Sequence, residues 1–102
     1  QAAGDFLERH FGLRRTGGNA GMAFLTDDGG GLVLSLMKAG KSAAVEYPAT
    51  FHIGFYIDSE ARVDEIHRRL KDEGHEVSTP ARHHGYTFYV KAPGGFTVEL
   101  GA

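Results

Sequence analysis

Residues 51–57 read Phe-His-Ile-Gly-Phe-Tyr-Ile, and residues 96–100 read Phe-Thr-Val-Glu-Leu. Both stretches alternate large apolar residues with small or polar ones. This pattern is typical of β-strands with one buried face, because successive side chains of a strand point to opposite sides. The polar face of the first stretch carries His52, and that of the second carries Glu99. If the two strands belong to one sheet, the sequence predicts that His52 and Glu99 face each other.

Length, composition and charge narrow the class of protein. With 102 residues, of which 41% are hydrophobic and 24% charged, the chain is expected to form a single domain spanning residues 1–102. A formal net charge of -2, with Lys and Arg scattered, argues against nucleic acid as a partner. The absence of Cys excludes disulfides and fits a cytoplasmic location. No apolar run approaches the ~20 residues that span a bilayer, so no membrane association is expected.

The first half of the chain is expected to hold one helix and two strands. Residues 4–11 place apolar side chains on one side of a helix that Gly12 ends, and His10 on this helix is expected to be exposed. Two strands, residues 22–26 and 31–37, flank an Asp- and Gly-rich reversal at residues 27–30. A polar linker follows.

The second half is expected to continue from the residue 51–57 strand into a helix over residues 60–73. Val63, Ile66 and Leu70 recur there at helical spacing, Asp58 or Ser59 can cap the start, and Gly74 ends the helix. A short extended stretch at residues 75–79 comes next. Strands at residues 86–91 and 96–101 then flank the turn Ala-Pro-Gly-Gly at residues 92–95.

The two halves repeat one another in their order of elements. The helix-ending glycine and both later strands recur with offsets that differ by only a few turn residues, whereas the first half has no counterpart of the residue 51–57 strand. The sequence therefore predicts a duplicated module whose first strand is missing from module one. The alternative is coincidence, since Gly-ended helices and Gly-rich hairpins are common.

This pattern resembles the vicinal oxygen chelate superfamily, which includes glyoxalase I, fosfomycin-resistance enzymes, extradiol dioxygenases and bleomycin-binding proteins. The most specific part is residues 84–100, His-Gly-Tyr-Thr-Phe-Tyr-Val-Lys-Ala-Pro-Gly-Gly-Phe-Thr-Val-Glu-Leu. The resemblance implies an α+β fold in which paired βαβββ modules form an open, cup-shaped mixed sheet around a divalent metal. Module one would cover about residues 1–40, the linker about 38–49 and module two about 50–102. It also implies a homodimer.

The resemblance further implies a metal site. His52 and Glu99 match the two metal positions of the second module. Ser35 lies where many glyoxalase I-like members carry a carboxylate, so a three-ligand site is expected, with its third ligand on the missing strand. Zinc, manganese, nickel and iron all remain candidates, and so does a protein without metal. The plain alternative for His52 is a hydrogen-bonded structural histidine.

A substrate pocket is expected around this site. Alternation places a mixture of apolar and polar side chains on the inner faces, as small-molecule pockets usually have, namely Met22, Phe24, Thr26, Val33, Tyr56, Thr87, Tyr89, Lys91 and Thr97. The resemblance implies that Thr87 and Tyr89 contact substrate and act in catalysis. Lys91 could hold an anionic group, and His84 could reach the mouth of the cup as an acid or base. Each has a structural alternative: cross-strand packing for Tyr89, solubility for Lys91 and a solvated loop for His84.

Three functions remain open at this level. The leading hypothesis is a metal-dependent enzyme, a lyase, isomerase or transferase of the glyoxalase type that acts on a small polar or electrophilic molecule, including the addition of a thiol or water to an epoxide antibiotic. The second is a metal-free protein that binds and sequesters a small molecule such as an antibiotic. The third is a dimeric module with no small-molecule role, which leaves the polar inner faces unexplained.

Overall fold

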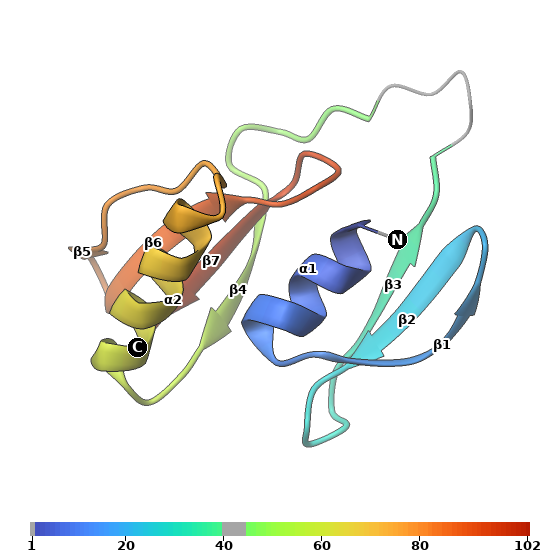
Figure 1. Ribbon diagram of the computed structural model, residues 1–102, viewed down its shortest axis with the longest axis horizontal. Helices are drawn as coiled ribbons and strands as arrows, with labels where there is room; N and C mark the ends of the chain where they lie inside the picture. The colour runs from blue at the N-terminus through green and yellow to red at the C-terminus, as the bar shows by residue number, and fades with distance from the viewer. Residues whose placement is uncertain (1, 40–44) are drawn as a thin grey trace. The chain divides into compact units, whose positions relative to one another are not determined.

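The computed structural model describes residues 2–39 and 45–102. Its elements follow the order α1, β1, β2, β3, β4, α2, β5, β6, β7 (Figure 1). The chain divides into two compact units, Gln1–Glu46 (unit 1) and Tyr47–Ala102 (unit 2). Part of the predicted linker, residues 40–44, lies outside the described residues. Each unit folds around its own sheet.

Unit 1 is a helix with a three-stranded antiparallel sheet. Its elements are α1 (Ala2–Phe11), β1 (Arg14–Asn19), β2 (Met22–Thr26) and β3 (Val33–Met37), with the strands in the order β1-β2-β3. Gly12 follows α1 with a φ of 70°, the left-handed conformation predicted for it. The buried apolar side chains come from one side of α1, from the segment before β1 and from alternate positions of β2: Phe6, Leu7, Leu13, Ala23 and Leu25.

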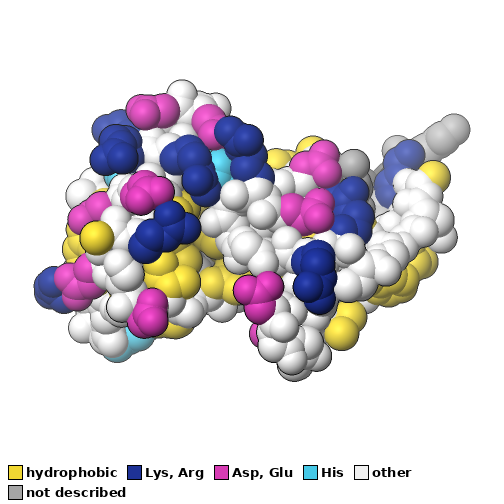
Figure 2. All heavy atoms as spheres, turned by 60° about the horizontal axis from the view of Figure 1, so that its bottom comes forward, with side chains coloured by type: hydrophobic (Ala, Val, Ile, Leu, Met, Phe, Trp, Pro, Cys, Tyr) yellow, Lys and Arg dark blue, Asp and Glu magenta, His cyan; other side chains and the backbone are white. Residues whose placement is uncertain are grey.

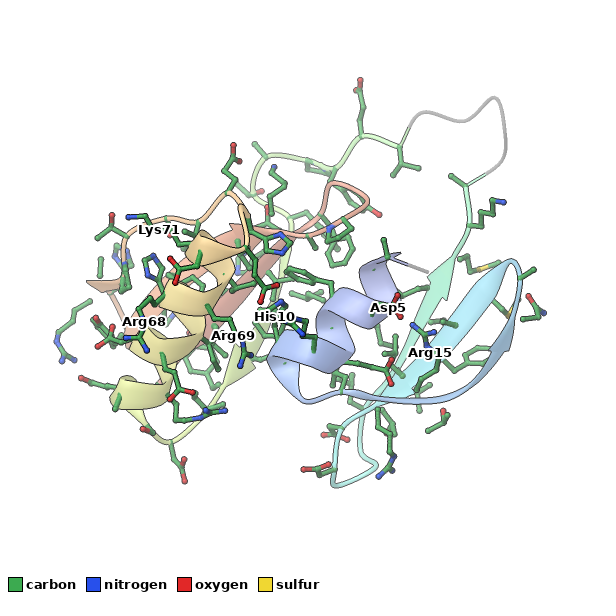
Figure 3. All side chains as sticks on the ribbon, viewed as in Figure 1. Asp5, His10, Arg15, Arg68, Arg69 and Lys71 are labelled. Atoms are coloured by element: carbon green, nitrogen blue, oxygen red, sulfur yellow. The ribbon has the colours of Figure 1, made fainter. Side chains whose placement is uncertain are left out.

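Strand β1 was not predicted, because its sequence Arg-Arg-Thr-Gly-Gly-Asn has no apolar alternation. It forms by pairing with β2, with a register shift between Arg15 and Gly17. Arg15 also reaches α1, where its Nη2 lies 3.0 Å from a carboxylate oxygen of Asp5 (Figure 3). Gly18 is required on β1, since it has a φ of 140° and a Cβ there would lie 2.4 Å from the carbonyl oxygen of Met22. This strand therefore forms because of its pairing with β2 and its backbone conformation, and not because it buries an apolar face.

One expectation for α1 was wrong. His10 is only 4% exposed, although a histidine on this helix was expected to face solvent. The imidazole lies on the same helix face as the buried Phe6, one turn earlier, and the two ring centroids are 5.4 Å apart.

Unit 2 is a four-stranded mixed sheet with a helix across one face (Figure 1). Its elements are β4 (His52–Tyr56), α2 (Glu60–Asp72), β5 (Ala81–Arg82), β6 (Tyr86–Lys91) and β7 (Thr97–Gly101). The strand order is β4-β7-β6-β5, with β4 parallel to β7 and the other pairs antiparallel. The predicted α+β class is therefore confirmed.

Helix α2 begins where the sequence predicted and ends one residue earlier, at Asp72, with Glu73 as its C-cap. The Ser59 hydroxyl accepts a hydrogen bond from the Arg62 N–H at 3.2 Å, and Gly74 follows the helix with a φ of 88°. The apolar face of α2 and the apolar face of β6 and β7 form one core: Val63, Ile66, Leu70, Phe88, Val90, Val98 and Leu100. The opposite face of this sheet is the one that carries His52 and Glu99.

The internal repeat is visible in the topology. The order α1, β1, β2, β3 matches α2, β5, β6, β7, and β1-β2-β3 has the same strand order as β5-β6-β7. Unit 2 has one additional strand, β4, which lies beside β7. This is the predicted residue 51–57 strand, which has no counterpart in the first half of the chain. The shared topology favours duplication over coincidence.

None of the described helices is long and apolar enough to cross a membrane. On the face shown in Figure 2, basic and acidic side chains are interspersed rather than gathered by sign. Arg68, Arg69 and Lys71 all come from α2 (Figure 3), whose sequence also holds four acidic residues, Glu60, Asp64, Glu65 and Asp72.

Candidate metal and substrate site

The site lies on the face of the unit 2 sheet that α2 does not cover. In the parallel register of β4 and β7, His52 pairs with Thr97 and Gly54 pairs with Glu99. His52 and Glu99 are thus diagonal neighbours on adjacent strands, and His52 Nε2 lies 3.5 Å from Glu99 Oε1. The prediction that the two face each other is confirmed. The carboxylate side chain is 5% exposed and the imidazole side chain 40% exposed.

Gly54 makes room for the buried carboxylate. A Cβ at this position would lie 3.2 Å from Glu99 Oε1, closer than an ordinary van der Waals contact. Glycine in the middle of a strand costs stability because it has no side chain to pack. Here the missing side chain leaves the space that Glu99 Oε1 occupies beside His52.

The tautomer of His52 follows from its hydrogen bond to the backbone of Thr50. His52 Nδ1 lies 3.0 Å from the carbonyl oxygen of Thr50. A carbonyl can only accept, so Nδ1 carries the proton and donates. In the neutral ring, Nε2 then presents a lone pair toward Glu99 Oε1. Two lone pairs that face each other are favourable only with a proton or a cation between them.

This donor set fits a divalent metal ion. Two ligand atoms that each lie about 2.1 Å from one ion are separated by roughly 3.0–3.4 Å in octahedral or tetrahedral geometry, close to the observed 3.5 Å. A ligating histidine usually donates its other ring N–H to a carbonyl or carboxylate, which fixes the ring. Thr50 supplies that carbonyl.

Tyr89 lies beside both candidate ligands. It pairs directly with Glu99 in the antiparallel register of β6 and β7, and its ring is edge-on to His52 with centroids 5.5 Å apart. Burial raises the pKa of the Tyr89 hydroxyl, and the charge of Glu99 and a hydrogen bond with it raise the pKa further. The phenol therefore keeps its proton at neutral pH and can donate.

Tyr56 and His84 contact the other oxygen of the same carboxylate. The Tyr56 hydroxyl lies 3.4 Å from Glu99 Oε2. His84 Nε2 lies 3.0 Å from the Tyr56 hydroxyl and 3.9 Å from Glu99 Oε2. Partial desolvation raises the pKa of Tyr56, and the Glu99 charge and hydrogen bond add to the shift. Sequence reasoning placed both residues at the pocket but did not foresee that they meet each other at Glu99.

A hollow of about 360 Å³ opens beside His52, and its lining residues come from the start of β4 and from the neighbouring strands, namely Ala49, Thr50, Phe51, His52, Tyr89 and Thr97. Sequence reasoning missed Ala49, Thr50 and Phe51, and Phe51, which alternation placed on the buried face, is 43% exposed. The signal for Thr50 was present, since it lies two residues before His52 and alternation continues the polar face to it.

Two other predicted residues of unit 2, Thr87 and Lys91, are not among those that line this hollow. Thr87 is 2% exposed, and its hydroxyl has no hydrogen-bond partner among the described residues. Lys91 is exposed and pairs with Thr97 at the strand end. Phe24 and Ser35 belong to unit 1, where the register of β2 and β3 pairs them with each other.

The comparisons with known protein families and with solved structures agree with each other. Residues 1–100 match the family described as Glyoxalase/Bleomycin resistance protein/Dioxygenase superfamily. A search of curated protein sequences gave no match. Among solved structures, a possible glyoxalase from Bacillus cereus is 49% identical, with a TM-score of 0.87 over 99% of this chain and 87% of that chain.

Two further structures share the fold at lower identity. A lactoylglutathione lyase from Agrobacterium tumefaciens is 26% identical, with a TM-score of 0.73 over 98% of this chain and 82% of that chain. The fosfomycin resistance protein FosX from Listeria monocytogenes, solved with Mn(II) and sulfate, is 24% identical, with a TM-score of 0.77 over 97% of this chain and 77% of that chain.

Proposed function

Because the chain belongs to the Glyoxalase/Bleomycin resistance protein/Dioxygenase superfamily, we propose that it is a divalent-metal-dependent enzyme acting on a small polar or electrophilic molecule. The reaction is a lyase or isomerase step of the glyoxalase type, or the addition of a thiol or water to an epoxide. The names of two structural neighbours, a lactoylglutathione lyase and a fosfomycin resistance protein with Mn(II), support this range of chemistry.

The observation that carries the proposal is the contact between His52 and Glu99. Nε2 faces Oε1 at 3.5 Å while Nδ1 donates to the Thr50 carbonyl, so the pair presents two lone pairs to one point. His52 and Glu99 would hold the ion there. Zinc, manganese, nickel and iron accept this nitrogen and oxygen donor set. Two ligands leave further coordination positions for water, substrate or other protein groups.

Bound at this point, a divalent ion would act as a Lewis acid on a substrate oxygen. The surrounding side chains have distinct tasks. The hollow beside His52 would hold the substrate against Phe51 and Tyr89. The protonated Tyr89 hydroxyl would donate to an oxygen that gains negative charge in the transition state. Lys91 at the end of β6 would attract an anionic substituent, and His84 would move a proton.

We also propose that the protein works as a symmetric homodimer with a small-molecule substrate. Strand β4 is the outer strand of its sheet, and β3 is an outer strand in unit 1. Outer strands present backbone groups that can pair with another strand. A second copy offers a complementary edge through an isologous contact.

The alternative is a metal-free protein that binds a small molecule. The lining of the hollow favours it to some extent, because none of its residues is acidic or carries a lysine or arginine, and Phe51 and Tyr89 offer aromatic surface. This alternative does not explain why His52 is oriented toward a buried carboxylate.

Metal titration separates the two functions. The protein would be freed of metal with a chelator, and Mn²⁺, Zn²⁺ and Ni²⁺ binding measured by calorimetry. We expect one ion per chain for the unaltered protein and a large loss for Glu99→Gln and His52→Ala. Glu76→Gln and His83→Ala, which change exposed residues outside the site, are the matched controls and should bind like the parent.

Turnover of thiol-conjugated aldehydes and epoxide antibiotics would then be followed with and without the ion. Turnover that requires the ion and falls with Glu99→Gln supports the enzyme. Ligand binding that survives both the chelator and Glu99→Gln, with no turnover on the panel, would replace it with the binding protein.

A further inference from the structure

The ring of Tyr56 rests against backbone at three glycines. A Cβ on Gly101 would lie 2.9 Å from Tyr56 Cε2, one on Gly85 would lie 3.5 Å from the same atom, and one on Gly54 would lie 3.9 Å from Cε1. These glycines come from β7, from the segment before β6 and from β4. The ring therefore lies against all three segments, in space that their missing side chains leave free. Its hydroxyl has a defined position although the residue is 53% exposed.

The direction of the hydrogen bonds at this hydroxyl is fixed by chemistry. The Glu99 carboxylate only accepts, so the Tyr56 O–H donates to Oε2 at 3.4 Å. Because the only hydroxyl proton of Tyr56 is in this bond, the Tyr56 oxygen must accept in its contact with His84, and His84 Nε2 donates to it at 3.0 Å. A donor chain runs from His84 through Tyr56 to Glu99. The same carboxylate offers its other oxygen, Oε1, to His52.

We infer that Tyr56 is a positioning residue that occupies Glu99 Oε2, so that the carboxylate presents Oε1 alone to an ion shared with His52. This inference rests on the proposed function, since it concerns the same metal site. Without the Tyr56 hydroxyl, the carboxylate loses one of the groups that hold its plane. The carboxylate can then rotate or offer both oxygens to the ion. The orientation in which only Oε1 faces His52 becomes one of several that the side chain adopts. Partners of metal ligands typically change metal affinity by about 10–100-fold when removed.

The chain contains a matched control for this role. The Tyr86 hydroxyl donates to an Asp64 carboxylate oxygen at 2.5 Å, so Tyr86→Phe also removes one hydrogen bond from tyrosine to carboxylate. Asp64 lies on α2, which covers the other face of the sheet, and it is no candidate ligand. Comparing Tyr56→Phe with Tyr86→Phe separates the loss of positioning from the general loss of a hydroxyl.

The test uses Mn²⁺ alone as the probe. We expect Tyr56→Phe to bind Mn²⁺ about 10–100-fold more weakly than the parent by calorimetry and to give a changed electron paramagnetic resonance spectrum of the bound ion. Tyr86→Phe should match the parent in both measurements. Circular dichroism and thermal melting of the metal-free proteins confirm that each variant is folded. His84→Ala should weaken binding less than Tyr56→Phe, because Tyr56 keeps its bond to Glu99, and His83→Ala should have no effect.

Failure of this inference and failure of the proposed function look different. If Tyr56→Phe binds Mn²⁺ as tightly as the parent and with the same spectrum, while Glu99→Gln does not bind, the positioning role is wrong and the metal site stands. If Tyr86→Phe weakens binding as much as Tyr56→Phe, the positioning role is also wrong. If the parent itself binds no divalent ion, the proposed function falls, and the role of Tyr56 falls with it.

Discussion

The phenol ring of Tyr89 stands perpendicular to the imidazole of His52, at an interplanar angle of 90° with the centroids 5.5 Å apart. The same tyrosine pairs with Glu99 across β6 and β7. One side chain thus touches both candidate ligands and lines the hollow beside them. Its hydroxyl is the group best placed to act on a bound substrate rather than on the ion.

Replacing Tyr89 with Phe should therefore separate catalysis from metal binding. The ring that packs on His52 is kept, but the lost hydroxyl also makes a hydrogen bond with Glu99, so Mn²⁺ affinity should fall by no more than about 10-fold. If the hydroxyl donates to a developing oxyanion, kcat/KM should fall by about 10²–10³-fold. Steady-state kinetics and calorimetry on the same preparation give both values. A parallel loss of metal and turnover would mean that Tyr89 supports the ligands instead.

Gly54→Ala should disturb the site without removing any of its polar groups. The new methyl would lie 3.2 Å from Glu99 Oε1, so the carboxylate must shift by a few tenths of an ångström away from its place beside His52. We expect weaker Mn²⁺ binding in calorimetry, with the fold retained in circular dichroism. Gly31→Ala is the control, because a Cβ there meets nothing within 4 Å. Equal affinity for the two variants would show that Oε1 is not a ligand.

Much of this arrangement could be predicted from residue patterns, because it depends on alternation. His52 and Glu99 sit in strands with clear apolar faces, and the faces determine where the polar side chains point. Strand β1 could not be found this way, since Arg14–Asn19 has no buried apolar residue and forms through its pairing with β2. The contact of Tyr56 with Glu99 also escaped prediction. It requires the parallel register of β4 and β7 and a loop that brings His84 to the same point, and neither follows from local sequence.

The loop that carries His84 is tied to α2 by an ion pair that responds to acid. Arg82 donates two hydrogen bonds to the Glu60 carboxylate, at 2.9 and 2.6 Å. This bonding lowers the pKa of Glu60 below its ordinary value of 4.5. A carboxyl whose folded-state pKa is depressed stabilises the fold above its unfolded-state pKa and loses that contribution as pH falls through the folded-state value.

Glu60→Gln should therefore reduce the acid sensitivity of the fold. We expect the thermal midpoint to fall less steeply below pH 4.5 in this variant than in the parent, with both curves measured at low salt, where an exposed pair is least screened. Glu76→Gln, at an exposed glutamate outside this pair, should keep the parent's curve. If the thermal midpoints of the parent and Glu60→Gln fall identically below pH 4.5, the Arg82–Glu60 pair contributes no measurable stability.

The proposed dimer makes a prediction that does not involve metal. If the outer edge of β4 pairs with a second copy, light scattering at micromolar concentration should give twice the mass of the chain. The Ile57 N–H donates to the Gly101 carbonyl on β7, so by alternation the N–H of Tyr56 points to the outer edge of β4. Tyr56→Pro removes that donor and should shift the mass toward the monomer. Because the Tyr56 ring also lies against Gly101 of β7, circular dichroism must show that the variant remains folded. A parent that scatters as a monomer would contradict the proposal.

The parallel pairing of β4 with β7 also has a consequence for the order in which the protein is made. In the sheet, β7 lies between β4 and β6, although it follows both of them in the chain. A nascent chain that has emerged from the ribosome as far as β6 already contains His52, but β7, the strand that pairs with β4, has not yet been made. Closing a contact between such distant residues is a late and slow event in folding. Insertion of β7 completes this sheet and brings Glu99 beside His52 in the same step, so an ion held by this pair, as we propose, would bind only after β7 has joined the sheet.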